Sequence, residues 1–250
     1  MVPDESFFAP PGWTIHFLPE TGSTNDLAGR AAEDGAPERT VFVTGHQTKG
    51  RGRMARSWLE QPGSSLLFSV IFRRSHNEPF LLTMACSVAA CRAVEGVAGV
   101  RTEIKWPNDL MVNGRKLAGV LAEASWAKGN PFVVVGMGIN VNFDPSGVEG
   151  IPDSATSLLR EAGRAVSRPE LLNRILAELD SLLGQPLPAL GPSIRSQWAE
   201  RLWRRRQRVV IAEDGREMEG VFEDVDADGA LLLRLDDGSV IPIRVGDLVI

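Results

Sequence analysis

The chain is poor in the residues that build disulfides and most metal sites. It has two cysteines, Cys86 and Cys91, among 250 residues. Two thiols cannot form a disulfide scaffold, and no Cys/His spacing typical of a metal site occurs. We expect both to be small core residues on a buried helix, reduced in a cytoplasmic protein. The histidines, His16, His46 and His76, are scattered, so they predict core or surface positions and no Ser-His-Asp or Cys-His nucleophile.

Targeting and membrane signals are also lacking. The segment before Trp13 carries prolines and acidic residues without a basic start, which excludes a signal peptide. We expect no apolar run long enough to cross a bilayer. The formal net charge of -5 argues against a bulk affinity for DNA, RNA or anionic membranes. We therefore expect neither DNA nor a membrane among the partners.

The order of the periodic segments predicts an α+β protein. We expect an N-terminal arm (1–12), a mixed-sheet domain (13–190), a linking helix (191–206) and a small antiparallel β-barrel (207–250). Strands are predicted at 13–18, 40–44, 65–72, 101–105, 110–112, 117–122 and 131–142, with an Asn-Gly hairpin turn at 113–114. Helices are predicted at 27–33, 79–97, 169–183 and 193–203, and a Pro/Gly-rich break at 184–192. Three Asp-Gly turns, at 214–215, 228–229 and 237–238, separate four or five short segments of the barrel.

Residues 49–56, here called the Gly/Arg loop, are the most chemically distinctive segment. Gly50 and Gly52 alternate with Arg51 and Arg53, so the backbone can approach a ligand closely. Guanidinium groups suit phosphate and carboxylate because their planar forks bond in bidentate fashion. The loop predicts a phosphate clamp that orders on binding, with Trp58 placed to stack on a purine. A solvated basic loop and a nucleic-acid contact remain alternatives, and the P-loop spacing is absent.

Two further segments carry candidate binding residues. The run KWPND at 105–109 forces an extended or turned backbone between strands, which places Lys105, Asn108, Asp109 and Lys116 near one sheet end. Lysines there neutralise a carboxylate or phosphate, and Asp109 suits Mg²⁺; a surface turn with ordinary ion pairs is the alternative. The run GMGINVN at 136–142 lacks the third glycine and the helix of a Rossmann fingerprint, and its glycines indicate close approach of a ligand or another backbone.

The basic run at 201–208, RLWRRRQR, has two interpretations. It is either a nucleic-acid contact or a linker helix whose arginines face acidic neighbours. The second is preferred because the protein is acidic overall.

Taken in order, four of these segments resemble the biotin protein ligases. They are STN at 23–25, GRGR at 50–53 ending in Trp58, KWPND at 105–109 with KLAG at 116–119, and GMGIN at 136–140. Each motif is weak alone, but the ordered set is specific, and the resemblance covers roughly residues 13–250. It implies a catalytic domain that binds biotin and ATP (13–190) and is related to the class II aminoacyl-tRNA synthetases, followed by an SH3-like barrel.

The resemblance also implies an activity and its partners. It implies an ATP-dependent ligase that forms biotinyl-5′-AMP and transfers biotin to a lysine of a biotin carboxyl carrier protein, with Mg²⁺ accompanying ATP. A homodimer formed through sheet edges is an expectation by analogy only. Residues 1–12 are too few for the helix-turn-helix that some members carry, so we expect the monofunctional type.

Site residues are carried over by resemblance onto matching positions. The catalytic residues are Arg51, Arg53 and Lys116. The biotin-binding residues are Ser23, Thr24, Asn25, Gln47, Gly50, Arg51, Lys116 and Gly119. The nucleotide-binding residues are Arg53, Trp58, Asn108, Asp109, Asn140 and Asn142, and Asp109 is the metal candidate. The Gly/Arg loop departs from the family pattern at Lys49, where a small residue is common, and at Ala55, where glycine is usual.

Three rival functions follow from the same sequence. A lipoate or octanoyl ligase would share the fold, although the Gly/Arg loop favours biotin. A nucleic-acid-binding module would use residues 49–56 and 201–208, against the net charge. A non-catalytic biotin-responsive regulator lacks a DNA-reading domain here.

Overall fold

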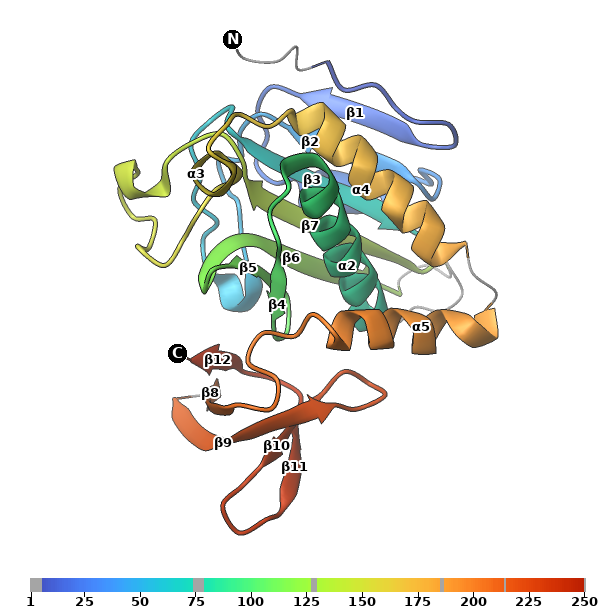
Figure 1. The fold of residues 1–250 in the computed structure, drawn as a ribbon. Helices are drawn as coiled ribbons and strands as arrows, with labels where there is room; N and C mark the ends of the chain where they lie inside the picture. The colour runs from blue at the N-terminus through green and yellow to red at the C-terminus, as the bar shows by residue number, and fades with distance from the viewer. Residues whose placement is uncertain (1–5, 74–78, 127–129, 185–186, 214, 250) are drawn as a thin grey trace.

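The computed structural model describes residues 6–73, 79–126, 130–184, 187–213 and 215–249. His76 lies outside these residues. The larger, N-terminal part of the chain is built around a seven-stranded sheet in the order β1-β2-β3-β7-β6-β5-β4 (Figure 1). Its strands are β1 (Thr14–Leu18), β2 (Thr40–Thr44), β3 (Ser65–Phe72), β4 (Glu103–Lys105), β5 (Asp109–Val112), β6 (Arg115–Ser125) and β7 (Phe132–Asn140). The β1–β2 pair is parallel and the other neighbours are antiparallel, so the sheet is mixed as predicted.

A second sheet follows after the helical region. It is antiparallel throughout, in the order β11-β10-β9-β8-β12. Its strands are β8 (Arg208–Glu213), β9 (Arg216–Val225), β10 (Leu231–Arg234), β11 (Val240–Ile243) and β12 (Asp247–Val249). Gly215, Gly229 and Gly238 take left-handed φ values, as the Asp-Gly turns predicted. The expected α+β class, a mixed sheet followed by a small β unit, is confirmed.

Alternation along β3 divides the core into two layers. Val70 and Phe72 lie in the main core with α2 (Pro79–Ala98) and α4 (Arg168–Leu183). Ile71, one residue out of phase, packs on the opposite face against Ala28 and Ala32 of α1 (Thr24–Glu33). The sheet is therefore covered on both faces, and the N-terminus of α1 lies against the middle of β3 and β7, at Ser69 and Gly136.

Helix α2 corrects an expectation about membranes. Contrary to the prediction that no apolar run reaches that length, its 20 residues are long and apolar enough to span a bilayer. However, 67% of its most apolar window is buried within the protein, which accounts for its apolarity on all sides. Cys86 and Cys91 lie buried on it as expected, and burial raises the pKa of both thiols.

The region after α4 was predicted wrongly. The expected break at 184–192 and helix at 193–203 are replaced by one helix, α5 (Leu187–Ala199), with Pro192 inside it. Leu190, Ile194 and Trp198 are buried at helical spacing, and Trp198 meets the Phe80 ring of α2 edge-on at 5.7 Å between centroids. Burial of this stripe offsets the hydrogen bond that proline removes.

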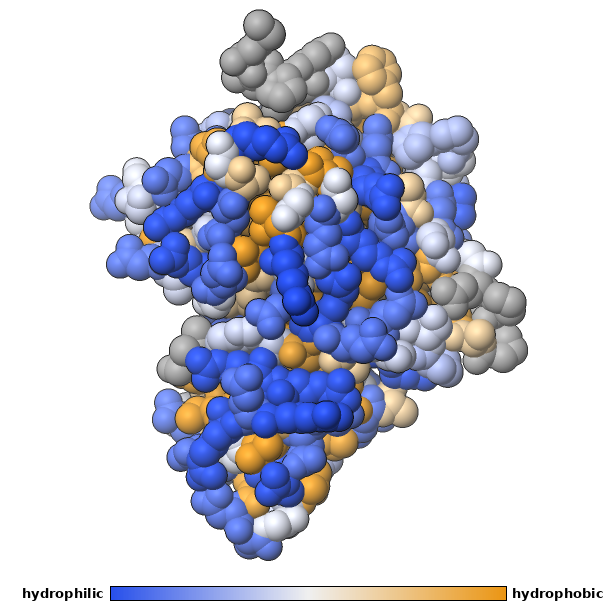
Figure 2. Space-filling view, in the orientation of Figure 1, coloured by the Kyte–Doolittle hydropathy of each residue, from blue (hydrophilic) through white to orange (hydrophobic). Residues whose placement is uncertain are grey.

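The basic run after α5 forms turns instead of a helix, but three of its five arginines do face acidic partners. Arg201 pairs with Glu95 at 2.6 Å and Arg205 with Asp224 at 2.5 Å. Arg208 bonds both Glu219 and Asp236. The visible face of the second sheet is largely hydrophilic (Figure 2). The acidic-neighbour interpretation of this run is therefore confirmed.

Turn 226–229 joins the two sheets. The Trp106 indole N–H donates to the Gly229 carbonyl at 3.1 Å, and both groups are buried between the β4–β5 connection and the second sheet. Gly229 has φ 83°, and a Cβ there would overlap the Phe80 ring. The turn therefore requires glycine for two independent reasons.

We expect Gly229→Ala to lower the free energy of unfolding by about 2–4 kcal/mol, because it adds left-handed strain to an overpacked contact. Gly238→Ala is the matched control, since its φ is 85° but nothing lies within 4 Å of a Cβ there. It should cost only about 1–2 kcal/mol. Urea unfolding of both variants checks this, and equal losses would contradict the proposed contact.

Candidate functional site

A cavity of about 390 Å³ opens where the predicted segments meet. It lies between the N-terminus of α1, the Gly/Arg loop, β5, β6, β7 and the tip of the second sheet. The predicted residues that line it are Ser23, Thr24, Asn25, Gln47, Arg51, Arg53, Trp58, Asn108, Asp109, Lys116, Gly119 and Asn140. One cavity therefore collects residues from segments as far apart in the sequence as Ser23 and Asp247.

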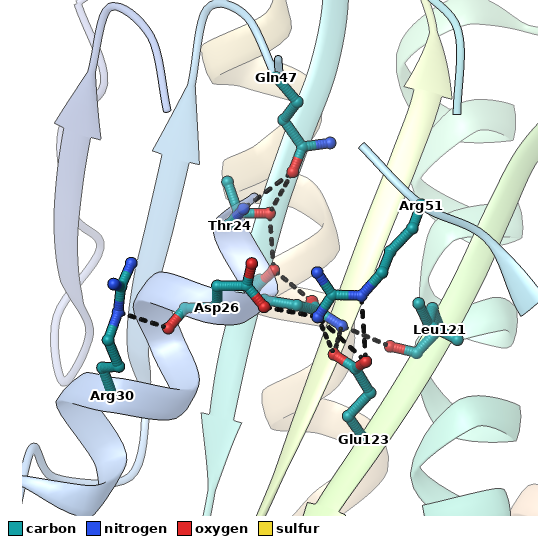
Figure 3. A network of polar contacts seen from close by, with 9 residues as sticks. Thr24, Asp26, Arg30, Gln47, Arg51, Leu121 and Glu123 are labelled. Carbon is teal, nitrogen blue, oxygen red and sulfur yellow. Dashed lines mark hydrogen bonds and ion pairs between the residues drawn. The ribbon is translucent and has the colours of Figure 1, made fainter. Parts of the chain in front are cut away.

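One end of the cavity is an uncharged hydrogen-bonding network. The Gln47 carbonyl oxygen accepts from the Thr24 backbone N–H at 2.8 Å and from its hydroxyl at 3.1 Å. The Gln47 amide nitrogen points away from Thr24 (Figure 3). Ser69 supports the network from β3, with its hydroxyl oxygen 2.7 Å from that of Thr24. Fixing the carbonyl in this way leaves the amide N–H₂ of Gln47 as a positioned donor.

Asn25 is held more completely by the protein. Its Nδ2 donates to Glu123 at 2.6 Å, and its Oδ1 lies 2.6 Å from the Ser69 hydroxyl. A Cβ on Gly136 would overlap the Asn25 Oδ1 atom. Glycine in this strand therefore makes room for the Asn25 amide, as the predicted close approach required.

Arg51 is balanced by two carboxylates (Figure 3). Its Nη2 lies 2.6 Å from Asp26 Oδ1 and 3.1 Å from both Glu123 oxygens. The hydrogen bond that Arg51 donates to Asp26 is the main cause that raises the pKa of Arg51 and lowers the pKa of Asp26. Arg51 therefore lines the cavity while its two carboxylate partners lie outside the lining, and Glu123 links Arg51 to Asn25.

The Gly/Arg loop folds back on itself as a narrow arm. Gly52 donates to the Arg56 carbonyl at 2.7 Å, and Trp58 donates to the Gly50 carbonyl at 3.0 Å. The tip turns at Met54, whose φ is 53° within a short 3₁₀ turn, Arg53–Ala55. The arm therefore holds its arginines and Trp58 on the cavity side.

Asp247 of β12 holds the arm from the second sheet. Its carboxylate pairs with Arg53 at 3.3 Å and with Arg56, and Arg53 also donates to the Gly246 carbonyl at 3.2 Å. Arg53 reaches Asn108 Oδ1 at 3.3 Å on its other side. The second sheet therefore contributes a side chain to the cavity wall.

Lys116 and Asp109 form an ion pair in the part of the cavity lining next to Trp58. Lys116 Nζ lies 2.8 Å from Asp109 Oδ1 and 5.7 Å from the centre of the Trp58 ring. Lys105 lies nearby outside the cavity lining, and desolvation lowers its pKa. Asp109 is the carboxylate nearest to Lys116, so an incoming anion would compete with it for the ammonium.

Two glycines make a flat floor under Trp58. Gly119 of β6 and Gly138 of β7 are directly opposite in the register. A Cβ on Gly138 would come within 2.6 Å of the Trp58 ring, and one on Gly119 within 3.2 Å. Trp58 Nε1 and Asn140 Oδ1 are buried there without a hydrogen-bond partner among the described residues. Such atoms indicate where a polar ligand would bond.

Comparison with known proteins gives this arrangement a family. The sequence model of the Biotin/lipoate A/B protein ligase family matches residues 18–142, and that of the biotin protein ligase C-terminal domain matches residues 207–249. The biotin--[acetyl-CoA-carboxylase] ligase of Mycobacterium tuberculosis is 34% identical over 256 residues, covering 98% of this chain and 92% of that protein. The chain belongs to the biotin protein ligases.

Two other relatives support the same placement. The biotin protein ligase from Aquifex aeolicus, solved in complex with biotin and ATP, superposes with a TM-score of 0.82 at 26% identity and covers 94% of this chain and 97% of that one. The bifunctional ligase/repressor BirA of Bacillus subtilis is 39% identical over 159 residues, which are 62% of this chain. That alignment covers 49% of the relative, so the chain matches about half of its length.

Two of the residues expected to bind ligands in a biotin protein ligase do not line the cavity. Gly50 supports the arm, and its backbone carbonyl is occupied by Trp58. Asn142 forms a reciprocal pair with Val166: its Nδ2 donates to the Val166 carbonyl at 2.8 Å, and its Oδ1 accepts from the backbone N–H at 2.9 Å. The Asn142 side chain therefore secures a loop behind the site.

Sequence reasoning assigned no role to Glu123, Arg56 and Asp247. Glu123 lies four residues after Gly119 on β6, so alternation along that strand could have placed both on one face. Arg56 belongs to the Gly/Arg loop itself. Asp247 lies 191 residues beyond Arg56 in another sheet, and no local pattern marks it.

The Asp26–Arg51 pair predicts a pH dependence of stability. The folded state lowers the pKa of Asp26 below 3.8, so the pair contributes stability above that value and loses it as the pH falls through the folded-state pKa. Between about pH 5 and pH 2, wild type should therefore lose about 0.2–1 kcal/mol more than Asp26→Asn, a range typical of exposed pairs. Urea unfolding of both proteins across this pH range measures the difference. Superimposable pH profiles would show that the pair adds nothing.

Proposed function

We propose that this chain activates biotin with ATP to form biotinyl-5′-AMP and then transfers biotin to a lysine of a biotin carboxyl carrier protein. The observation that carries the proposal is the polarity of the cavity. An uncharged donor–acceptor network lies at one end, Arg53 and Lys116 lie at the other, and between them is an apolar stretch of the cavity, here called the slot, where the Trp58 ring packs on the glycine floor. Biotin has the same order of groups: a neutral ureido ring, an apolar chain and a carboxylate.

The uncharged end is suited to the ureido ring. Ser23, Thr24 and Gln47 supply hydroxyl and amide groups, and the Gln47 amide is already oriented by Thr24. A buried amide-like ligand binds selectively where each polar atom finds a partner. Asn25, whose amide is occupied by Glu123 and Ser69, supports this end through the protein. The Gly119 backbone closes the slot below the ring.

The first step joins two anions and therefore needs positive charge. The biotin carboxylate attacks the α-phosphorus, a new C–O–P bond forms and pyrophosphate leaves. Arg51, Arg53 and Lys116 lower the barrier by stabilising the negative charge that builds up between the carboxylate and phosphate. Lys116 must exchange Asp109 for the substrate oxygens, and Arg53 must exchange Asp247. The preformed ion pairs keep these cations in place beforehand.

The nucleotide end is assigned to Trp58, Asn108, Asp109 and Asn140. Trp58 Nε1 and Asn140 Oδ1 are an unpartnered donor and acceptor on one side of the cavity, which fits a heterocyclic base. Asn142 acts there only through the loop that it secures. Arg53 links this end to the reaction centre.

A magnesium ion fits this site as a companion of ATP. Among the described residues, no cluster of three or more His, Cys, Asp or Glu side chains is arranged to hold a metal. Mg²⁺ is commonly held by one or two carboxylates together with substrate phosphates. Asp109 is the residue that would hold it, and the ion would supply charge stabilisation to the phosphates.

In the second step, the carrier lysine amine attacks the acyl carbon and AMP leaves with the bonding electrons. An amide forms while the mixed anhydride breaks, so no enzyme nucleophile is needed. The buried Cys86 and Cys91 thiols, whose pKa values burial raises, agree with this. The arm over the slot would exclude water from the adenylate. The carrier protein, a homodimer and a cytoplasmic location stay predictions.

A ligase for lipoate or octanoate is the second candidate. Its substrates also carry a carboxylate on an apolar chain and would suit Lys116 and the slot equally. They have no ureido group, so the positioned Gln47 amide and the Thr24 network favour biotin. A nucleic-acid function is disfavoured because Arg201, Arg205 and Arg208 are already bonded to acidic residues.

The deciding experiment is incubation with Mg²⁺, α-labelled ATP and one carboxylic acid, without an acceptor protein. We expect biotin to give pyrophosphate and a bound labelled adenylate. Adenylate formed only with lipoate or octanoate would keep the reaction and replace the substrate. Absence of an adenylate with every acid would refute the proposal, and filter binding across salt concentrations would then test nucleic acid.

Lys116→Ala should lower the rate of biotin adenylation by about 10²–10³-fold, because a charge aimed at the reacting oxygens is removed. Lys49→Ala is the matched control, since Lys49 is exposed at the start of the Gly/Arg loop and does not line the cavity. Single-turnover adenylate formation measures both variants. A wild-type rate in Lys116→Ala would remove this lysine from the mechanism.

A further inference from the structure

A partly buried hydrogen bond between His46 and Glu60 lies outside the cavity and joins the chain before the Gly/Arg loop to the chain after it. His46 Nδ1 lies 2.6 Å from Glu60 Oε1. The Glu60 side chain is 2% exposed and that of His46 is 31% exposed. Because an ionised carboxylate only accepts, the proton of this bond lies on the imidazole nitrogen. Neither residue lines the cavity.

The chain positions of the pair give it leverage on the site. His46 directly precedes Gln47, and Glu60 follows Trp58 by two residues. The His46 backbone is fixed to the sheet side, because its carbonyl accepts from Thr21 N–H at 3.0 Å. The pair therefore connects the fixed backbone just before Gln47 to the chain segment just after Trp58.

Glu60 is retained in an unfavourable setting. Its second carboxylate oxygen, Oε2, is buried without a hydrogen-bond partner among the described residues. Leaving a buried carboxylate oxygen unbonded costs stability, more so for a charged group than for a neutral one. Such local violations concentrate at functional positions, where stability is exchanged for geometry.

The slot has little tolerance for movement of Trp58. The Trp58 ring packs so closely on Gly138 that a Cβ there would come within 2.6 Å of it. A shift of the chain segment that carries Trp58 would increase the distance between the Trp58 ring and the Gln47 amide. Lys116 on β6 and Asp109 on β5 would stay in place. Small displacements of positioning groups have large effects on ligand placement.

We propose that the His46–Glu60 pair is a positioning device that sets the distance between the Gln47 amide and the Trp58 ring. It thereby determines how tightly the acid substrate is held. This inference rests on the proposed function for the identity of that substrate. Both are positioning residues, because they act through Gln47 and Trp58 and do not touch the ligand.

The test uses Glu60→Ala and His46→Ala, which remove the bond, and Glu60→Gln, whose amide oxygen can still accept from the imidazole. Glu217→Ala, an exposed position on β9, is the control. We expect both alanine variants to raise KM for biotin about tenfold in biotin-dependent ATP–pyrophosphate exchange, and to raise KM for ATP as well because Trp58 also faces the nucleotide, with kcat within about twofold of wild type. The double alanine variant should match either single one, and Glu60→Gln should stay near wild type.

A merely structural role predicts a different pattern. It would lower kcat and the unfolding free energy and raise KM for both biotin and ATP together. Glu60→Gln would then not restore any of these quantities. That pattern, additive alanine effects or an unchanged KM for biotin in Glu60→Ala would overturn the proposal. We expect Glu60→Gln to unfold at the same or a higher urea concentration than wild type, because it removes a buried charge.

A second measurement separates this inference from the proposed function. Trypsin cleavage after Arg53 and Arg56, followed by mass spectrometry, needs no substrate. The alanine variants should be cut there severalfold faster than wild type and Glu217→Ala, while cleavage after Arg216 stays equal. Faster cleavage without any biotin-dependent exchange in wild type would keep the positioning role and reject the substrate. Unchanged cleavage would reject the positioning role even if exchange occurs.

Discussion

Charge balance around one cavity is the constraint on which the rest of the structure depends. Four cations line a space of about 390 Å³, and each is paired with at least one carboxylate: Arg51 with Asp26 and Glu123, Arg53 and Arg56 with the shared Asp247, and Lys116 with Asp109. Without these partners, the cations would repel one another and open the arm. The two sheets and α1 are arranged so that each supplies part of this set.

The sequence was informative wherever structure is local. The strands at Thr40–Thr44 and Ser65–Phe72 were predicted to the residue, because short apolar runs between turn signals leave little choice. The first turns of the helix at Leu187–Ala199 were missed because Pro192 and Gly191 indicate a break, whereas contact with α2 decides the outcome. Burial of Trp198 is a tertiary property that no window of sequence contains.

The candidate site shows the same division. The motifs, taken in their order along the sequence, identified most of the predicted residues that line the cavity. The glycines of β7 were correctly expected to allow a close approach. Asn142 shares its motif with Asn140, yet two residues further along the chain it bonds Val166 behind the site. Asp247 carries no motif at all and acts through its place in β12. The functional assignment of these residues rests on chemistry that only the assembled cavity displays.

The glycine floor has a consequence for how specificity can change. Gly119 and Gly138 present backbone alone to the slot, and β-sheet pairing holds that backbone rigid. There are no rotamers to rearrange and no side chain to shorten, while any addition invades the space of Trp58. Mutation can therefore remodel only the movable wall. New substrates for this scaffold would arise through changes in the arm, while the floor continues to set how closely the Trp58 ring approaches the sheet.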